Sequence, residues 1–185
     1  MAWSSVGGIN AKQYKCGYCG MNVGSDRGWG VSGSRWRIYV CPSCQKPTFF
    51  DEAGDATPSP APGNDVAHVP AELAKLYQEA RVCAGAGAHT SAVLACRKML
   101  MNIAVTQGAN PGESFLRYVE FLATSGYVPP NGRGWVDHIR KKGNEATHEI
   151  ALMGQADAEE LIGFTEMLLK FIYEFPARVP PSTHP

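Results

Sequence analysis

The segments "CGYC", residues 16–19, and "CPSC", residues 41–44, each hold two cysteines separated by two residues, and 21 residues lie between the pairs. A pair at this spacing offers two sulfur ligands to one metal ion through a tight turn, and two such pairs complete a tetrahedral four-thiolate site. The spacing therefore predicts a structural Zn²⁺ site rather than disulfides or a redox dithiol. The predicted ligands are Cys16, Cys19, Cys41 and Cys44.

The sequence around the cysteines predicts a small β module. "RWRIYV", residues 35–40, alternates charged and apolar residues before the second pair, and "PTFFD", residues 47–51, follows it. Both segments are typical of short strands. Residues 1–52 are therefore predicted to form a zinc ribbon, because so short a segment buries too little apolar surface to fold without a metal.

The rest of the chain predicts helices. Residues 53–69 are rich in Pro, Ala, Gly and Asp and predict a semi-extended linker. Residues 70–178 repeat apolar side chains at helical spacing in five segments joined by short connections. The predicted fold is mainly α, an antiparallel five-helix bundle with a small N-terminal β ribbon. Residues 179–185 are Pro-rich and predict a flexible tail.

The last two helices have specific predicted boundaries. The fourth helix is expected over residues 135–149. The fifth is expected to open at Asp157, with Glu160 completing a capping box, and to end at Pro176.

Arginine and tryptophan are interleaved between the two cysteine pairs. Such interleaving suits phosphate contact by arginine and base stacking by tryptophan. The alternative is that the tryptophans cover the back of a thin ribbon while the arginines remain in water. The candidate nucleic-acid-binding residues are Arg27, Trp29, Arg35, Trp36 and Arg37.

The segment "HIRKKGNEATHEI", residues 138–150, concentrates positive charge in the helical part. Arg140, Asn144 and His148 recur every four residues, so a helix aligns them as a stripe on one face. The neighbouring cations Lys141 and Lys142 are further candidates for nucleic-acid contact.

Three segments carry a family resemblance: "SAVLACRKMLMNI" at 91–103, the segment at 138–150, and "FTEMLLKFIYEFP" at 164–176. Residues 70–178 resemble HEPN-like domains, and in particular an uncharacterised bacterial and phage family with a GN-x-x-x-H signature. Members are attached to restriction-enzyme subunits, and some carry zinc ribbons. The resemblance implies a five-helix fold, homodimerisation and a link to defence or nucleic-acid metabolism.

The resemblance also raises the question of catalysis. HEPN ribonucleases cleave RNA without metal, using an Arg and a His from each of two subunits. Asn144 and His148 match that motif, but Gly143 occupies the arginine position and Arg140 lies one turn earlier. A displaced guanidinium has a different reach, which favours binding over cleavage. Arg97, inside an apolar helix, either faces the stripe or extends its head into water.

The composition sets the remaining expectations. Lys+Arg and Asp+Glu are equal at 17 each, which excludes an overall basic chain, so any nucleic-acid surface must be local. No secretory signal or membrane span is recognised, and a cytoplasmic protein without an evident small-molecule substrate is expected. The leading prediction is a homodimeric binding or adaptor protein that contacts nucleic acid or a nucleoprotein partner in bacterial or phage defence. The alternatives are a metal-independent ribonuclease that uses His148, Arg140 and Asn144, and a protein-only dimeric adaptor.

Overall fold

The computed structural model describes residues 4–132, 134–139 and 152–179. The chain divides into two compact units, Met1–Ala61 and Pro62–Pro185, and the boundary falls inside the segment predicted as a linker. Each unit is described by itself below.

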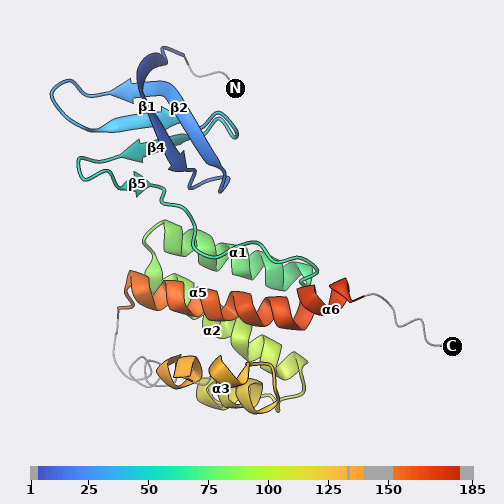
Figure 1. The fold of residues 1–185 in the computed structure, drawn as a ribbon. Helices are drawn as coiled ribbons and strands as arrows, with labels where there is room; N and C mark the ends of the chain where they lie inside the picture. The colour runs from blue at the N-terminus through green and yellow to red at the C-terminus, as the bar shows by residue number, and fades with distance from the viewer. Residues whose placement is uncertain (1–3, 133, 140–151, 180–185) are drawn as a thin grey trace. The chain divides into compact units, whose positions relative to one another are not determined.

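The first unit is a five-stranded antiparallel sheet in which every strand pairs with its neighbour in sequence (Figure 1). The strands are β1 (Gly7–Lys15), β2 (Asn22–Gly30), β3 (Arg37–Val40), β4 (Pro47–Phe50) and β5 (Ala56–Thr57). The two predicted strands are confirmed as β3 and β4. The rings of Tyr14, Tyr39 and Phe50 pack together on one face, with centroids 5.2–6.1 Å apart, and supply the apolar contacts of this small sheet.

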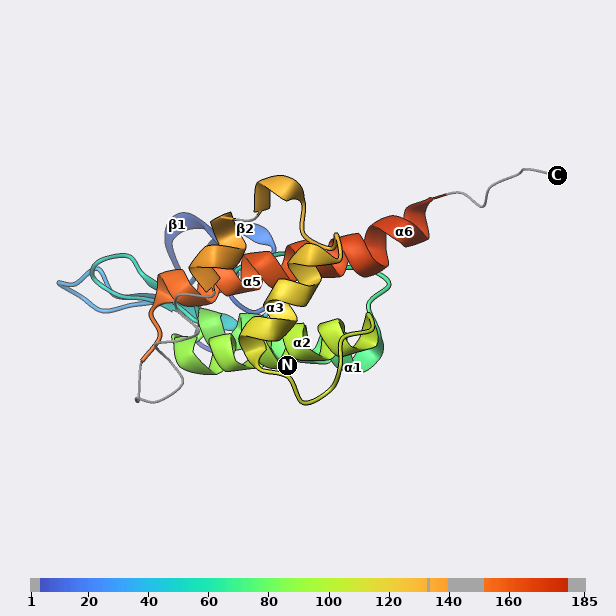
Figure 2. The same cartoon turned by 90° about the horizontal axis from the view of Figure 1, so that it is seen from below.

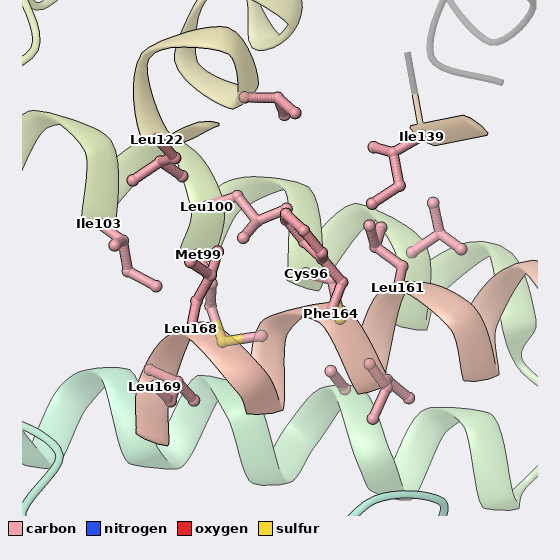
Figure 3. Close-up of a cluster of buried hydrophobic side chains, with 14 of the residues drawn as sticks. Cys96, Met99, Leu100, Ile103, Leu122, Ile139, Leu161, Phe164, Leu168 and Leu169 are labelled. Atoms are coloured by element: carbon pink, nitrogen blue, oxygen red, sulfur yellow. The ribbon is translucent and has the colours of Figure 1, made fainter. Parts of the chain in front are cut away.

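The second unit is helical. Its elements are α1 (Ala71–Gly85), α2 (His89–Thr106), α3 (Phe115–Thr124), η1 (Pro130–Gly132), a helical segment at 134–139, α5 (Gln155–Leu169), the π-helical turn η2 (Lys170–Glu174) and α6 (Phe175–Arg178). Helix α2 contacts α1, α3 and α5, and both ribbon views show it among them (Figures 1 and 2). Its apolar face meets that of α5 in the core shown in Figure 3, where Cys96, Leu100 and Phe164 are fully buried.

The predicted fold class is wrong. The chain is not a mainly α, five-helix bundle with a minor ribbon but a mixed fold, in which a five-stranded sheet accompanies the helices. Strands β1 and β2 have nine residues each, longer than the segments that the sequence marked as strands. Their glycines and polar residues hide the apolar alternation on which strand prediction depends.

The ends of the last helix also differ from the prediction. Helix α5 begins at Gln155, and Asp157 serves as the third helical residue, where its Oδ2 accepts the Gly154 N–H at 2.8 Å. The helical path then passes Pro176, because a π-helical turn precedes it and Pro176 lies in the first turn of α6, where a backbone N–H is not required.

Within the described part of the chain, every helix falls short of the length and apolarity that crossing a lipid bilayer requires.

Candidate metal centre and the sheet surface beside it

Four cysteine side chains converge at one end of the sheet. The Sγ atoms of Cys16, Cys19, Cys41 and Cys44 all lie within 4.8 Å of one another. Two of the separations, Cys16–Cys44 and Cys19–Cys41, are 3.8 Å, far longer than the ~2.05 Å of a disulfide bond, and all six cysteines are free. The cluster is compatible with a metal site, as the spacing predicts.

The two cysteine turns repeat one pattern of backbone hydrogen bonds. In the first turn, the Cys16 N–H donates to Met21 O and the Gly20 N–H donates to Cys16 O, both at 2.9 Å. In the second turn, the Cys41 N–H donates to Lys46 O at 3.0 Å and the Gln45 N–H donates to Cys41 O at 2.9 Å. Gly20 and Gln45 take equivalent left-handed conformations, with φ of 69° and 60°. Each turn is therefore shaped by its own backbone to present two sulfur atoms on the same side.

The thiols influence one another's ionisation. Burial raises the pKa of the Cys44 thiol to about 12, and the neighbouring cysteines add to the rise. Burial also raises the pKa of Cys16. Burial acts in the same direction on Cys19, but the Met21 backbone N–H and the neighbouring sulfur atoms together lower its pKa to about 7. A cation among the sulfur atoms favours the thiolate form of all four, because it offsets their mutual repulsion.

Apolar side chains occupy the sheet face that carries Trp29. Direct cross-strand pairing sets Trp29 beside Ile38 and Ile38 beside Phe49, so the three side chains share a face. Trp36, which is 47% exposed, packs edge-to-face on Phe49 with ring centroids 6.1 Å apart. We call these four residues, Trp29, Trp36, Ile38 and Phe49, the aromatic face. Arg27 is exposed and lies two residues before Trp29 on β2.

The other face of the sheet carries a polar groove of about 320 Å³. Lys12, Arg35 and Arg37 line it together with the buried rings of Tyr39 and Phe50. The ammonium group of Lys12 lies 4.6 Å from the centre of the Phe50 ring, a cation–π contact. The five arginine and tryptophan candidates are thus divided between the two faces of the sheet.

Two of these candidates also hold the fold. Arg37 Nη1 donates to the carbonyl oxygens of Ser34 and Trp36, at 2.8 and 2.7 Å, and so fastens the turn between β2 and β3. The indole N–H of Trp29 donates to Ser5 O at 3.0 Å, which fixes the orientation of the ring. Their side chains are therefore ordered without a ligand.

The basic stripe of the helical unit cannot be placed from the structure. Arg140, Lys141, Lys142, Asn144 and His148 lie outside the described residues, so the ribonuclease interpretation stays a prediction.

Arg97 is half-buried in a small cavity that Ile139 and Met153 also line. Its guanidinium carbon is 4.4 Å from the centre of the Phe115 ring, and burial lowers the pKa of the group. Asp157 and Glu160 line the same small cavity of about 30 Å³. His138 Nε2 is 3.4 Å from Glu160 Oε2 at the surface. Arg97 is thus held by an aromatic ring and faces a cavity that also contains carboxylates.

A set of buried charges was missed in the sequence. Residues 62–67, here called the strap, run along the helical unit and bind its acidic side chains. Glu166 is 9% exposed and accepts the backbone N–H of Asn64 at 2.9 Å and the Asn64 side-chain amide at 3.1 Å. Glu174, 6% exposed, accepts the Ala67 N–H at 3.0 Å. The signal was available, because both carboxylates lie in the largely apolar stretch 161–175, where the other charged residue is Lys170.

Arg81 completes the strap's attachment from α1. It is buried, and its guanidinium donates to Pro62 O at 2.9 Å and to Gly63 O at 3.0 Å, and pairs with Asp65. Because the strap has no regular secondary structure, these side chains satisfy backbone groups that a helix or strand would satisfy by itself. The strap therefore belongs to the helical unit.

Comparisons with known proteins give one match. The model of a family described as "Domain of unknown function (DUF4145)" matches residues 78–183, more than half of the chain. Searches of curated proteins and of solved structures both find no match. The match covers neither the sheet nor the four-cysteine cluster.

Proposed function

Because this chain belongs to the DUF4145 family, a family of unknown function whose match begins only at residue 78, we propose its function from the sheet unit that precedes the match. We propose a zinc-stabilised binding or adaptor protein that contacts nucleic acid, alone or in a nucleoprotein partner, through this sheet.

The ligand set supports zinc as the metal. Four sulfur ligands about 2.3 Å from a central Zn²⁺ form a tetrahedron whose edges are about 3.8 Å. The Cys16–Cys44 and Cys19–Cys41 separations are both 3.8 Å. Four thiolates complete the coordination of the ion and leave no position for water or substrate, so the proposed zinc is structural. When bound, it would tie the β1–β2 turn to the β3–β4 turn.

The charge distribution of the sheet supports a polyanionic partner, and this observation carries the proposal. The chain as a whole has a formal net charge of zero, but the sheet unit, residues 1–61, contains six Lys and Arg residues against four Asp and Glu residues, and residues 27–50 contain Arg27, Arg35, Arg37 and Lys46 with no acidic residue between them. This segment includes all of β3 and β4 and the end of β2. A local excess of cations on a sheet suits a phosphate backbone, even on a neutral chain.

The remaining parts of the proposal concern the helical unit and the setting. We propose that it is HEPN-like, that it forms a homodimer, and that the protein acts in bacterial or phage defence. A cytoplasmic setting suits four reduced thiols. Metal-independent RNA cleavage by His148 is the alternative, and replacing His148 by alanine in an RNA-cleavage assay separates cleavage from binding.

The test is a binding measurement on the zinc-loaded full chain. Fluorescence anisotropy of labelled single-stranded RNA, single-stranded DNA and duplex DNA would be followed at about 50 and about 200 mM salt. If about three cations contact phosphates of a single strand, affinity should fall on the order of 20-fold between these concentrations. Absence of binding to every nucleic acid at the lower concentration would refute the proposed function.

A further inference from the structure

We infer that the aromatic face is a base-stacking surface for single-stranded nucleic acid. This inference rests on the proposed function and deepens it, because it assigns unpaired bases to one face of the sheet. The four residues concerned are Trp29, Trp36, Ile38 and Phe49.

The two faces of the sheet differ in how their aromatic rings are used. Tyr39 and Phe50 are buried on the face opposite the aromatic face, where they pack with Tyr14. On the aromatic face, Trp36 is 47% exposed, and Trp29 and Phe49 are half-buried. A sheet face in contact with water is normally polar. Large rings left accessible on such a face mark a contact surface.

The arrangement of the aromatic face fits successive bases. Trp29, Ile38 and Phe49 lie in one cross-strand row over β2, β3 and β4. Neighbouring strands are about 4.8 Å apart, so the row is about 10 Å long. Sheets that bind single strands stack two or three bases over surfaces of this kind. Trp36 lies two residues before Ile38, immediately before β3, and widens the row beside Phe49, against which it is already packed.

The rings are oriented before any ligand arrives. The indole N–H of Trp29 is bonded to Ser5 O at 3.0 Å, and Trp36 rests edge-to-face on Phe49. Side chains that are already held lose less conformational entropy on binding. A stacking surface therefore needs little rearrangement in this unit.

Charge favours a nucleic acid over an apolar protein helix as the occupant. Arg27 is exposed and lies two residues before Trp29 on the same strand, so a cation shares the aromatic face, whereas Arg35 and Arg37 line the groove on the opposite face. Asp51 follows β4, but its Oδ1 accepts the N–H groups of Gly54 and Asp55 at 2.9 and 2.8 Å. Bases on the rings and a phosphate on Arg27 satisfy both kinds of group, as in other sheets that bind single strands.

Stacking is separated from phosphate contact by removing the bases. The probes are single-stranded RNA, single-stranded DNA and an abasic strand, each about twelve nucleotides long with the same charge. The full zinc-loaded chain should bind RNA or DNA about 5-fold or more tightly than the abasic strand, and tryptophan fluorescence should be quenched only by strands with bases. The RNA and DNA arms show which sugar is preferred.

Trp36→Ala and Phe49→Ala should each weaken binding to the base-containing strand about 5-fold or more and leave the weak abasic binding unchanged. Tyr18→Ala is the matched control, because Tyr18 is equally exposed, at 47%, but lies on the first cysteine turn. Its affinities should equal those of the wild type. Trp36→Phe keeps a ring and should retain most of the binding, which distinguishes stacking from loss of folding.

Two results would overturn the inference in distinguishable ways. Equal binding of abasic and base-containing strands, or unchanged binding by Trp36→Ala and Phe49→Ala, would refute stacking while leaving nucleic-acid binding in place. Failure of every strand to bind at low salt would refute the proposed function as well and leave a protein partner for this face.

Discussion

Replacing Glu166 by alanine should destabilise the helical unit strongly. The carboxylate is 9% exposed and accepts two hydrogen bonds from Asn64, at 2.9 and 3.1 Å. It also pairs with Lys170, four residues later on the same helix. Its removal leaves donors on the strap without an acceptor and a half-buried ammonium group without its counter-ion.

The expected loss follows from these contacts. A hydrogen bond to a charged group contributes about 1.5–3 kcal/mol, and breaking a buried charge pair costs about 3–5 kcal/mol. Lys170 is 28% exposed and can recover part of its hydration. We therefore expect a loss of about 3 kcal/mol in the free energy of unfolding. Glu166→Gln keeps an acceptor oxygen but not the charge, and should lose about half as much.

Urea denaturation followed by the helical circular dichroism signal measures these losses. Glu72→Ala is the matched control, because Glu72 also pairs with a lysine, Lys75 at 3.0 Å, but its side chain is 87% exposed. That change should cost about 0.5 kcal/mol or less. If Glu166→Ala cost no more than Glu72→Ala, the strap would not depend on the buried carboxylate and the reasoning would be refuted.

Acid should weaken the same attachment. Burial alone would raise the pKa of Glu166, but the bonds from Lys170 and Asn64 outweigh it, so the pKa lies below its ordinary value. A carboxyl group with a lowered folded-state pKa stabilises the fold fully above its unfolded value, about 4.3. That contribution is lost as the pH falls from there through the folded-state pKa. Glu166→Gln should make stability less dependent on pH in this range, which urea denaturation at several pH values would measure.

Three further predictions concern the metal, a glycine and the strap. Removing the metal with a chelator, or replacing Cys41 by serine, should unfold the sheet unit and leave the helical circular dichroism signal intact, because binding of structural zinc supplies on the order of 10 kcal/mol of folding free energy. Circular dichroism and metal analysis test this. A folded sheet after complete metal loss would contradict it. Gly63→Ala should lower the free energy of unfolding by about 2–3 kcal/mol, because φ is +72° and the new Cβ would lie 2.8 Å from the Tyr77 hydroxyl. Gly112→Ala is the control, since φ is +86° but the space around it is open, and it should cost about 1 kcal/mol. Urea denaturation measures both losses. A fragment that begins at residue 62 should have a free energy of unfolding in urea about 2 kcal/mol or more above that of a fragment that begins at residue 70. The shorter fragment lacks the strap's hydrogen bonds to Glu166 and Glu174. Equal stabilities would show that the strap is dispensable.

The sequence predicted those features whose cause is local. The cysteine spacing predicted the four-sulfur cluster, since each pair needs only its own turn to present two ligands. Residues 35–40, which alternate charged and apolar side chains, and residues 47–51, which follow the second cysteine pair, contain β3 and β4. The helical spacing of apolar residues within 70–178 also agrees with the core, where Ala92, Cys96 and Leu100 recur every four residues and are all fully buried.

Features that depend on distant partners were not predicted. The strap consists of residues typical of a linker, but its amides are satisfied by Glu166 and Glu174, about a hundred positions away. Composition alone does not reveal such partners. Strands β1 and β2 were missed for a related reason, because glycine-rich segments become strands only when pairing with a neighbour stabilises them. The division of Trp29 and Arg37 between opposite faces likewise depends on strand register.

The π-helical turn between α5 and α6 determines which side chain meets the strap. A π-helical turn holds one residue more than an α-helical turn, so the chain takes up one extra residue there without changing the side to which Glu174 points. Glu174 is 6% exposed and meets the Ala67 amide, whereas Phe175, at 41%, faces outward. Removing one residue from positions 170–173 should therefore leave a regular α-helical turn with Glu174 still opposite Ala67, whereas adding one residue should rotate the carboxylate away by about 100°. Chain length at this point is thus constrained in one direction, and an insertion should be tolerated less than a single deletion or a substitution at the exposed Phe171.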